Sequence, residues 1–246
     1  MKAMIFAAGI GSRLRPYTMH KPKALVEVGG KPLLEWVITK IINAGVNEII
    51  INVHHFADQI TNYLAVKQNF GIHIEVSDER NQLLDTGGGL KKAKWFLQGD
   101  KPFLLYNVDI LTTLNITELL KFHQTHGALA TLAVKKRPGS RYLLMNNNQE
   151  LCGWENIKTG EKIIAKPDPN LQQTAFSGVH VVSPSIFEII EETGVFSITP
   201  LYLRLAANHK LKGFNHQNDY WNDLGKPENL LKAEEALKDI GSKKFI

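Results

Sequence analysis

A short apolar run near the N-terminus is followed at once by glycines and positive charges, in the stretch FAAGIGSRLRPYTMHKPKALVEVGGKP (residues 6–32). Gly9 and Gly11 lie directly after the strand predicted over residues 2–8. Glycines at such a place let backbone N–H groups approach a phosphate closely. In an open α/β sheet, ligands bind beyond the carboxyl ends of the strands. The stretch therefore predicts a phosphate site after the first strand.

Two common phosphate-binding motifs are excluded at this turn. The dinucleotide pattern G-x-G-x-x-G would need glycine where Leu14 stands, and no G-x-x-x-x-G-K-[ST] loop occurs here. Cations take their place, namely Arg13, Arg15, Lys21 and Lys23. Arginine can hold phosphate oxygens through two parallel hydrogen bonds, and lysine supplies a point charge. The cluster indicates a polyphosphate ligand; the alternative is a surface turn whose long side chains point into water.

The composition is that of a globular chain with a small excess of positive charge. Its 246 residues are 43% apolar, carry a formal net charge of +5 and include one cysteine, Cys152. This length can bury a sizeable core, and a lone cysteine excludes an intrachain disulfide. The charge suits small phosphorylated substrates, because aromatic residues are not interleaved with the basic ones as in a nucleic-acid surface.

The sequence shows no targeting or membrane-spanning segment. No stretch approaches the roughly 20 apolar residues of a membrane span, and the first apolar run ends in glycines rather than in a signal-peptide cleavage site. We therefore expect a cytoplasmic protein whose partners are small molecules, with neither nucleic acid nor membrane among them. The oligomeric state is not readable from the sequence.

The hydrophobic pattern predicts an α/β fold. Up to Lys135, short β-branched runs alternate with segments of helical period, which indicates βαβ units and a mainly parallel sheet covered on both faces. The predicted strands are residues 2–8, 48–53, 72–78, 102–110 and 128–135, and the predicted helices are 32–45, 56–66, 86–97 and 115–127. We expect the glycines of TGGGL (86–90) to form a loop that opens the third helix.

The pattern changes after Lys135. Residues 141–169 alternate, contain many turn residues and have little helical period, which predicts antiparallel strands. The remaining prediction is a strand at 175–182, helices at 184–192 and 198–208, a strand at 211–216, a short strand at 220–225 and a closing helix at 227–240. We expect the tail, 241–246, to fray, and Trp36, Trp95 and Trp154 to pack in the core.

The opening stretch, extended to AAGIGSRLRPYTMHKPKALVEVGGKPLLEW (residues 7–36), resembles the signature of the sugar-1-phosphate nucleotidyltransferases. Only Glu27 departs from it, where proline is usual. The resemblance runs from Met1 to the closing helix. It implies a three-layer αβα Rossmann-like fold of the nucleotide-diphospho-sugar transferase type, with a mixed, mainly parallel sheet and a small antiparallel substrate subdomain. It also implies one domain over 1–240, with a nucleotide-binding part (about 1–135), a sugar-binding part (about 136–226) and the closing helix.

Enzymes of this family join a nucleoside triphosphate to a sugar 1-phosphate and release pyrophosphate. The resemblance implies that Ala8, Gly9 and Gly11 contact the nucleotide and its phosphates through the backbone. It implies that Arg13 stabilises charge on the leaving pyrophosphate, and that Lys23 holds the α-phosphate and the incoming phosphate. The cationic turn is then a triphosphate site.

The resemblance also implies a magnesium site made by two aspartates. Asp109 lies at the end of the predicted strand, in FLLYNVD, and Asp223 lies in YWNDLGKP, which is similar to the family's W-x-D-x-G-[TN]-P. Mg²⁺ prefers one or two carboxylates completed by phosphate oxygens and water. The alternative for each aspartate alone is a turn or cap residue. Val108 stands where the family usually has glycine, which narrows the room beside the ligand.

The segment LLDTGGGL resembles the base-binding loop of the family. Thr86, Gly87 and Gly88 are expected to present backbone groups to the base; the alternative is a helix N-terminus with a threonine cap. The triple glycine and the FSG run at 176–178 are closer to N-acetylmuramate-1-phosphate uridylyltransferases than to most glucose or mannose enzymes. The expected substrates are therefore UTP and N-acetylmuramate 1-phosphate.

Three residues are candidates for the sugar phosphate site. Lys166 stands where many relatives carry an E-K-P motif, although Ala165 replaces the glutamate, and Asn156 and Gly178 are further candidates. The alternative for Lys166 is a solvated loop lysine.

Other functions stay open. GTP with mannose 1-phosphate is the alternative substrate pair. A non-catalytic sugar-nucleotide-binding subunit would be expected to lack Arg13, Lys23 or an aspartate, and a glycosyltransferase would need a D-x-D motif.

Overall fold

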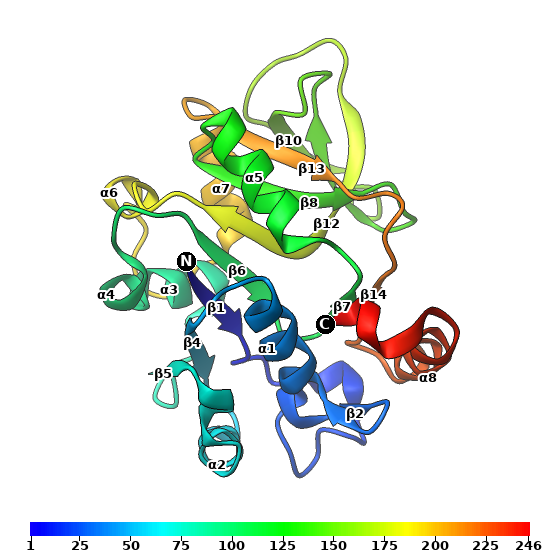
Figure 1. Ribbon diagram of the computed structural model, residues 1–246. Coiled ribbons are helices and arrows are strands. Elements are labelled where there is room, and N and C mark those ends of the chain that lie inside the picture. The colour runs from blue at the N-terminus through cyan, green and yellow to red at the C-terminus, as the bar shows by residue number, and fades with distance from the viewer.

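The computed structural model describes residues 1–246 and is built on a ten-stranded mixed sheet with helices on both faces (Figure 1). The strands run in the order β11-β10-β9-β12-β6-β1-β4-β5, and β8 and β13 extend the sheet from β12. The strands of the sheet are β1 (Lys2–Phe6), β4 (Glu48–Val53), β5 (His73–Asp78), β6 (Phe103–Asn107), β8 (Ala130–Lys135), β9 (Arg141–Met145), β10 (Leu151–Asn156), β11 (Glu161–Ile164), β12 (Gln172–Val182) and β13 (Leu211–Asn215).

The central strand β1 shows why this part of the sheet is buried on both sides. It pairs in parallel with β4 and with β6, and β4 pairs in parallel with β5. Alternate residues of a strand face opposite sides. Met4 and Phe6 accordingly belong to one hydrophobic cluster, and Ala3 and Ile5 to the other.

Helices cover both clusters, which makes three layers. One face carries α1 (Leu33–Asn43), α2 (Ala57–Val66) and α5 (Ile116–His126), and the other carries α3 (Asp85–Lys92), α4 (Lys94–Leu97), α6 (Ile186–Ile189) and α7 (Ile198–Ala206). Figure 1 shows α1 and α5 on the near side of the sheet and α7 on the far side. The predicted α/β class and layering are confirmed. None of the helices combines the length and the apolar composition that a membrane span needs.

The strand β12 joins the parallel sheet to the predicted antiparallel subdomain. It runs antiparallel to β6 and β8, and its first residues pair with β9, which continues into β10 and β11. The register shifts between Phe176 and His180, where Gly178 has a φ of +75°. A Cβ at Gly178 would lie 2.8 Å from Ile110 Cγ1. Glycine is therefore required where the strand changes partners.

A third hydrophobic cluster joins the C-terminal helix to the opening loop. It is made by α8 (Pro227–Ala236) and residues such as Leu14, Val26 and Trp36. The chain continues in a π-helical turn at 237–241 and a 3₁₀ turn at 242–245. Phe245 is only 1% exposed, and its ring centroid is 5.3 Å from that of Tyr220. The expectation of a frayed tail is wrong, because this aromatic side chain fills the cluster.

Three further predictions need correction. The glycines of TGGGL lie inside α3 rather than in a loop before it. The helix predicted over 184–192 is formed only at 186–189. Trp95 is 56% exposed because the single-turn α4 turns Phe96 inward instead, whereas Trp36 is buried and Trp154 is partly buried against the core, as expected.

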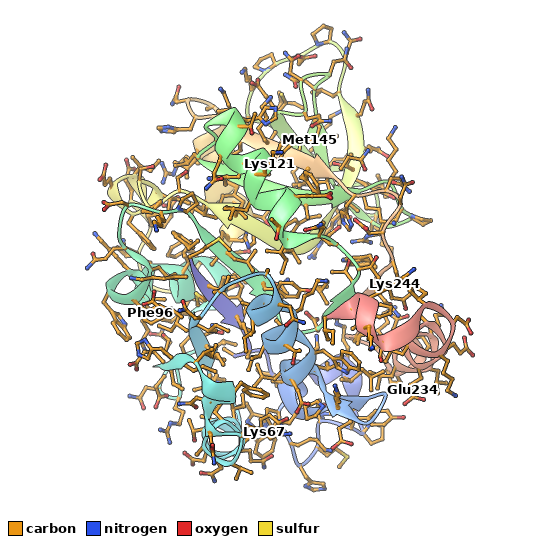
Figure 2. All side chains as sticks on the ribbon, in the orientation of Figure 1. Lys67, Phe96, Lys121, Met145, Glu234 and Lys244 are labelled. Carbon is orange, nitrogen blue, oxygen red and sulfur yellow. The ribbon has the colours of Figure 1, made fainter.

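Charged side chains lie on the outer surface. Lys67, Lys121 and Glu234 are exposed, while Met145 of β9 is buried (Figure 2). Two short ribbons complete the fold, namely β2 (Glu27–Val28) with β3 (Lys31–Pro32), and β7 (Ile110–Thr112) with β14 (Trp221–Asp223).

Candidate active site

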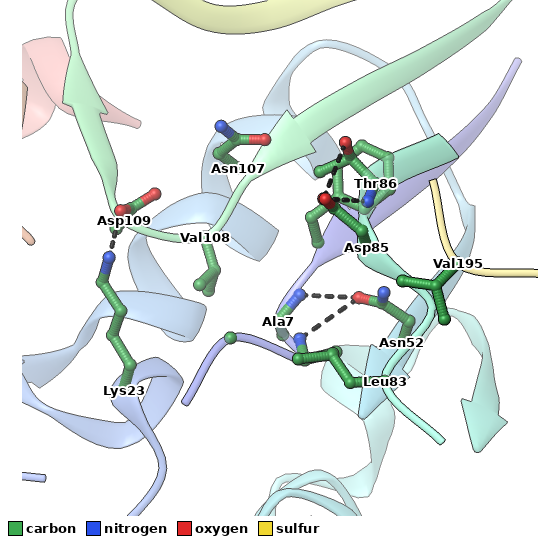
Figure 3. Close-up of a pocket in the computed structure, with 13 residues that line it drawn as sticks. Ala7, Lys23, Asn52, Leu83, Asp85, Thr86, Asn107, Val108, Asp109 and Val195 are labelled. Carbon is green, nitrogen blue, oxygen red and sulfur yellow. Dashed lines mark hydrogen bonds and ion pairs between the residues drawn. The ribbon is translucent and has the colours of Figure 1, made fainter. Parts of the chain in front are cut away.

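A pocket of about 380 Å³ lies at the carboxyl ends of β1, β4 and β6 (Figure 3). This is the edge of a parallel sheet at which ligands are expected. Its walls come from the turn after β1, the ends of β4 and β6, the start of α3 and the segment before α7. The lining residues are Phe6, Ala7, Ala8, Gly9, Lys23, Asn52, Leu83, Asp85, Thr86, Asn107, Val108, Asp109 and Val195.

The turn after β1 folds back onto Lys23. Gly11 has a φ of +71°, and a Cβ there would lie 3.1 Å from Lys23 Cβ and 3.0 Å from Thr18 Cγ2. The Thr18 hydroxyl donates a hydrogen bond to the Gly11 carbonyl at 2.8 Å. Position 11 therefore requires glycine, because its φ is positive and because Thr18 and Lys23 approach its Cα closely. Gly9 lines the pocket and has no neighbour at its Cβ position within 4 Å.

Four charged groups meet at one end of the pocket. The Lys23 ammonium forms an ion pair with the Asp109 carboxylate, and both side chains are largely buried, with 11% and 16% exposed. A Cβ at Gly225 would lie 2.8 Å from Asp223 Oδ1, 3.1 Å from Arg13 Nη2 and 3.3 Å from Lys23 Nζ. The structure thus brings together Arg13 and Lys23, the two cations with predicted roles in catalysis, and the two predicted metal-binding aspartates. Gly225, which leaves room for them, was not among the predicted site residues.

The β7–β14 ribbon holds the two aspartates beside each other. Asp223 is opposite Ile110 in the ribbon, and the Leu224 N–H donates to the Asp109 carbonyl at 2.8 Å. Asn229 on α8 donates through Nδ2 to the Asp223 carbonyl at 2.6 Å. Residues more than a hundred positions apart are therefore fixed by backbone hydrogen bonds.

The charge balance at this end suits a divalent cation. Burial raises the pKa of Asp223, the neighbouring Asp109 carboxylate raises it further, and Lys23 and Arg13 oppose the shift. Two carboxylates with like charge are stabilised by a positive ion between them. No group of three or more His, Cys, Asp or Glu side chains could hold a metal alone. Two carboxylates completed by substrate phosphate oxygens are the donor set that Mg²⁺ prefers, so Asp109 and Asp223 fit that ion.

The other end of the pocket depends on a buried polar network that sequence reasoning missed. The N–H groups of Ala7 and Ala8 donate to Asn52 Oδ1 at 2.8 and 3.3 Å, and Asn52 Nδ2 donates to Glu79 Oε1 at 2.8 Å. The Leu84 N–H donates to the other Glu79 oxygen at 3.0 Å. The network ties the turn after β1 to the segment that opens α3. Its only sequence signal is a polar Asn inside the apolar run of β4.

The predicted base-binding residues lie at this end but are also engaged in packing. Thr86 lines the pocket, and its hydroxyl accepts the N–H of Ile198 at 3.0 Å. The N–H groups of Gly87 and Gly88 both donate to the Phe196 carbonyl, at 2.9 and 3.1 Å. A Cβ at Gly87 would clash with the Phe196 ring. These glycines let residues 194–196 approach α3, and their contact with a base stays a prediction.

The three predicted sugar-site residues are separated. Asn156 closes the turn between β10 and β11, where its Oδ1 accepts the Lys158 N–H at 3.1 Å. Lys166 pairs with Glu150 at 3.0 Å, and neither it nor Asn156 lines the pocket. Gly178 does lie beside the pocket, since a Cβ there would be 2.9 Å from the Asn107 side-chain nitrogen. The roles of all three in sugar binding stay predictions.

Together, the sheet edge, the glycine turn and the cluster of cations and carboxylates have the features of an α/β protein that binds phosphorylated ligands. Residues 2–240 match the Nucleotidyl transferase family model. The chain belongs to this family, and the resemblance to sugar-1-phosphate nucleotidyltransferases is confirmed.

Individual relatives agree with this assignment. The chain is 32% identical to an N-acetylmuramate alpha-1-phosphate uridylyltransferase of Caulobacter vibrioides, over 96% of this chain and 97% of that protein. It is 30% identical to a mannose-1-phosphate guanyltransferase of Hypocrea jecorina, over 100% of this chain and 67% of that protein. A UDP-glucose pyrophosphorylase of Acinetobacter baumanii shares the fold, with a TM-score of 0.77 at 19% identity, covering 98% of this chain and 94% of that one.

Proposed function

We propose that this protein is a Mg²⁺-dependent sugar-1-phosphate nucleotidyltransferase that joins UTP to N-acetylmuramate 1-phosphate. The observation that carries the proposal is the meeting of Arg13, Lys23, Asp109 and Asp223 at one end of the pocket. Cations that face carboxylates across a narrow gap can hold a polyphosphate and its metal at once. Such a site needs no enzyme nucleophile.

The reaction would proceed by direct displacement. A phosphate oxygen of the sugar 1-phosphate bonds to the α-phosphorus of the nucleotide, and the bond from that phosphorus to the bridging oxygen of the β-phosphate breaks. Pyrophosphate leaves with the electron pair of that bond. Catalysis then rests on positioning and on charge stabilisation, as in other phosphoryl transfers.

The cations have distinct places in this scheme. Lys23 is paired with Asp109 and would exchange that carboxylate for the α-phosphate and the incoming phosphate when substrates bind. Arg13, at the outer side of the cluster, would neutralise charge on the departing pyrophosphate. Bound by Asp109, Asp223 and phosphate oxygens, Mg²⁺ would supply further charge neutralisation at the reacting phosphates.

The rest of the pocket would hold the nucleotide and the sugar. We assign the nucleoside to the end formed by Ala8, Gly9 and Thr86, and the sugar to the side where Gly178 lies beside Asn107. On this assignment residues 1–135 bind nucleotide, and residues 136–226 supply the sugar side. Lys166 would have to leave Glu150 to reach a sugar phosphate.

The choice of substrates is supported by the extent of the similarity. The uridylyltransferase relative is matched over 97% of its length, whereas the guanyltransferase relative is matched over 67%. The triple glycine of α3 and the FSG run of β12 favour the same pair of substrates. GTP with mannose 1-phosphate is the second candidate, because the two identities are 32% and 30%.

A pyrophosphate-release screen tests the proposal. UTP, GTP, dTTP and CTP are crossed with the 1-phosphates of N-acetylmuramate, mannose and glucose, each with Mg²⁺ and with Mg²⁺ removed by chelation. We expect the highest rate with UTP and N-acetylmuramate 1-phosphate, and loss of turnover on chelation. Release only with GTP and mannose 1-phosphate would select the second candidate, and silence in every well would remove the enzyme assignment.

A further inference from the structure

Arg137 lies beside the charged end of the pocket but has no part in the scheme above. It follows β8, and its guanidinium carbon is 3.9 Å from the ring centroid of Trp221, the first residue of β14. Asp223 is two residues further along that strand, and alternate residues of a strand share a face. Burial lowers the pKa of Arg137 and the Asp223 charge opposes that shift, so the guanidinium is partly desolvated near the carboxylate.

The protein supplies only one hydrogen-bond acceptor to the Arg137 guanidinium. Nη2 donates to the Phe176 carbonyl at 3.0 Å, whereas Nε is buried and has no hydrogen-bond partner. The exposed Arg204, by contrast, donates through Nε and Nη2 to both oxygens of Glu192, at 2.7 and 2.8 Å. A buried charged donor without an acceptor is costly. Nη1 also has no acceptor in the protein, and because it is not buried it is open to an acceptor that a ligand supplies.

The position of Arg137 points to the sugar rather than to the nucleotide phosphates. Arg13 and Lys23 already face the two aspartates. Arg137 comes instead from the connection between β8 and β9, and it bonds to Phe176, two residues before Gly178. The planar fork of arginine matches the two oxygens of a carboxylate. N-acetylmuramate carries a carboxylate on its sugar, whereas mannose, glucose and N-acetylglucosamine do not.

We infer that Arg137 is a specificity residue that binds a carboxylate substituent on the sugar of the sugar 1-phosphate. The inference rests on the proposed nucleotidyltransferase function and narrows its substrate to an acidic sugar 1-phosphate. The stack on Trp221 and the bond from Nη2 to Phe176 hold the guanidinium in place, so Nη1, which donates to no protein atom, remains for the ligand.

The test compares two substrates that differ only in the carboxylate-bearing group. Pyrophosphate release with UTP and Mg²⁺ is measured for N-acetylmuramate 1-phosphate and N-acetylglucosamine 1-phosphate, in the wild type and in Arg137→Gln. We expect Arg137→Gln to raise KM for the acidic sugar about 10- to 100-fold, as for a lost hydrogen bond to a charged group. The KM for UTP and the kcat/KM for the neutral sugar should change less than about threefold.

A substrate-side control does not depend on the variant folding. The methyl ester of N-acetylmuramate 1-phosphate removes the carboxylate charge in the wild type, and it should lose as much kcat/KM as Arg137→Gln loses on the free acid. The kcat/KM for the ester should be the same in Arg137→Gln as in the wild type. Arg137→Lys should recover part of the kcat/KM that Arg137→Gln loses on the free acid.

The possible failures are distinguishable. An equal loss on both sugars, or a raised KM for UTP, would make Arg137 a phosphate or structural residue and overturn the inference, while the nucleotidyltransferase function stands. A wild type that turns over only neutral sugar 1-phosphates would overturn both the inference and the proposed substrate. Absence of pyrophosphate release with every sugar would remove the function itself.

Discussion

The parallel and antiparallel parts of this molecule use their polar residues differently. Around β1, β4 and β6, side chains from distant segments converge on one pocket. In and beside β9–β11, Asn156 caps its own turn and Lys166 pairs with Glu150, which directly precedes β10. Parallel strands end at a common edge and leave their polar residues there, whereas a hairpin satisfies them locally. Site residues are therefore easier to predict in the parallel part.

The largest expected effect is the loss of activity when a cation is removed from the cluster of Arg13, Lys23, Asp109 and Asp223. Lys23→Ala should lower kcat/KM for pyrophosphate release about 10²- to 10³-fold, because in the proposed reaction it removes the charge that holds the reacting phosphates. Lys67→Ala is the matched control. That lysine pairs with Glu35 on the helical face, and its loss should change kcat/KM less than about threefold. Equal losses of kcat/KM in the two variants would show that a cation in the pocket matters no more for activity than a cation on the helical face.

The second effect is a loss of stability in acid that arises from three buried histidines. Burial lowers the pKa of His123 to about 4 and that of His180 to about 3, and burial with Lys135 and Arg137 lowers that of His216 to about 4. The unfolded chain binds these protons near pH 6.5, so stability is full above that pH and falls as the pH drops toward 4. We expect a loss on the order of 3 kcal/mol between pH 6.5 and 5.5.

Urea unfolding at several pH values measures this effect. His123→Gln keeps groups able to bond the Thr131 and Ser183 hydroxyls, which His123 contacts at 3.0 Å each, but it does not titrate. Its stability should fall less steeply with decreasing pH than that of the wild type, by up to about 1.4 kcal/mol per pH unit. An unchanged slope would show that His123 does not contribute.

The third effect concerns the strand that joins the two parts. Gly178→Ala adds backbone strain at a φ of +75° and a contact of 2.8 Å with Ile110 Cγ1, whereas Gly160→Ala adds strain at +74° with nothing within 4 Å. We expect Gly160→Ala to cost about 1 kcal/mol and Gly178→Ala about 2 kcal/mol more. Chemical denaturation measures both, and similar losses would mean that β12 can move away from the pocket wall.

The smallest effect is expected in the antiparallel part. The Lys166 side chain is 49% exposed, and exposed ion pairs contribute little. Lys166→Ala should therefore change the free energy of unfolding by less than about 1 kcal/mol and raise the KM for sugar 1-phosphate less than about tenfold. A loss of kcat/KM as large as that expected for Lys23→Ala would show that Lys166 leaves Glu150 to bind substrate.

The sequence predicted most of the fold because the elements have strong local signals. The β-branched run of β4, the apolar spacing of α1 and the Pro227 start of α8 each specify one element. The incorrect predictions concern segments whose structure is determined by contacts between residues distant in the sequence. Phe245 packs against Tyr220, which is distant in the sequence, and Gly87 and Gly88 are required in α3 because residues 194–196 approach that helix closely.

Within the site, sequence alone determined which residue types could serve the chemistry. The glycine turn with Arg13 and Lys23, and the two aspartates, are readable as motifs because phosphate and magnesium demand particular donors. Only the tertiary structure decided that they meet around Gly225, that Asn52 holds the turn, and that Arg137 is left with a buried, unpaired nitrogen. The meeting of the charged residues depends on the pairing of β7 with β14, and the position of Arg137 depends on its packing against Trp221 after β8. No local sequence pattern encodes either contact.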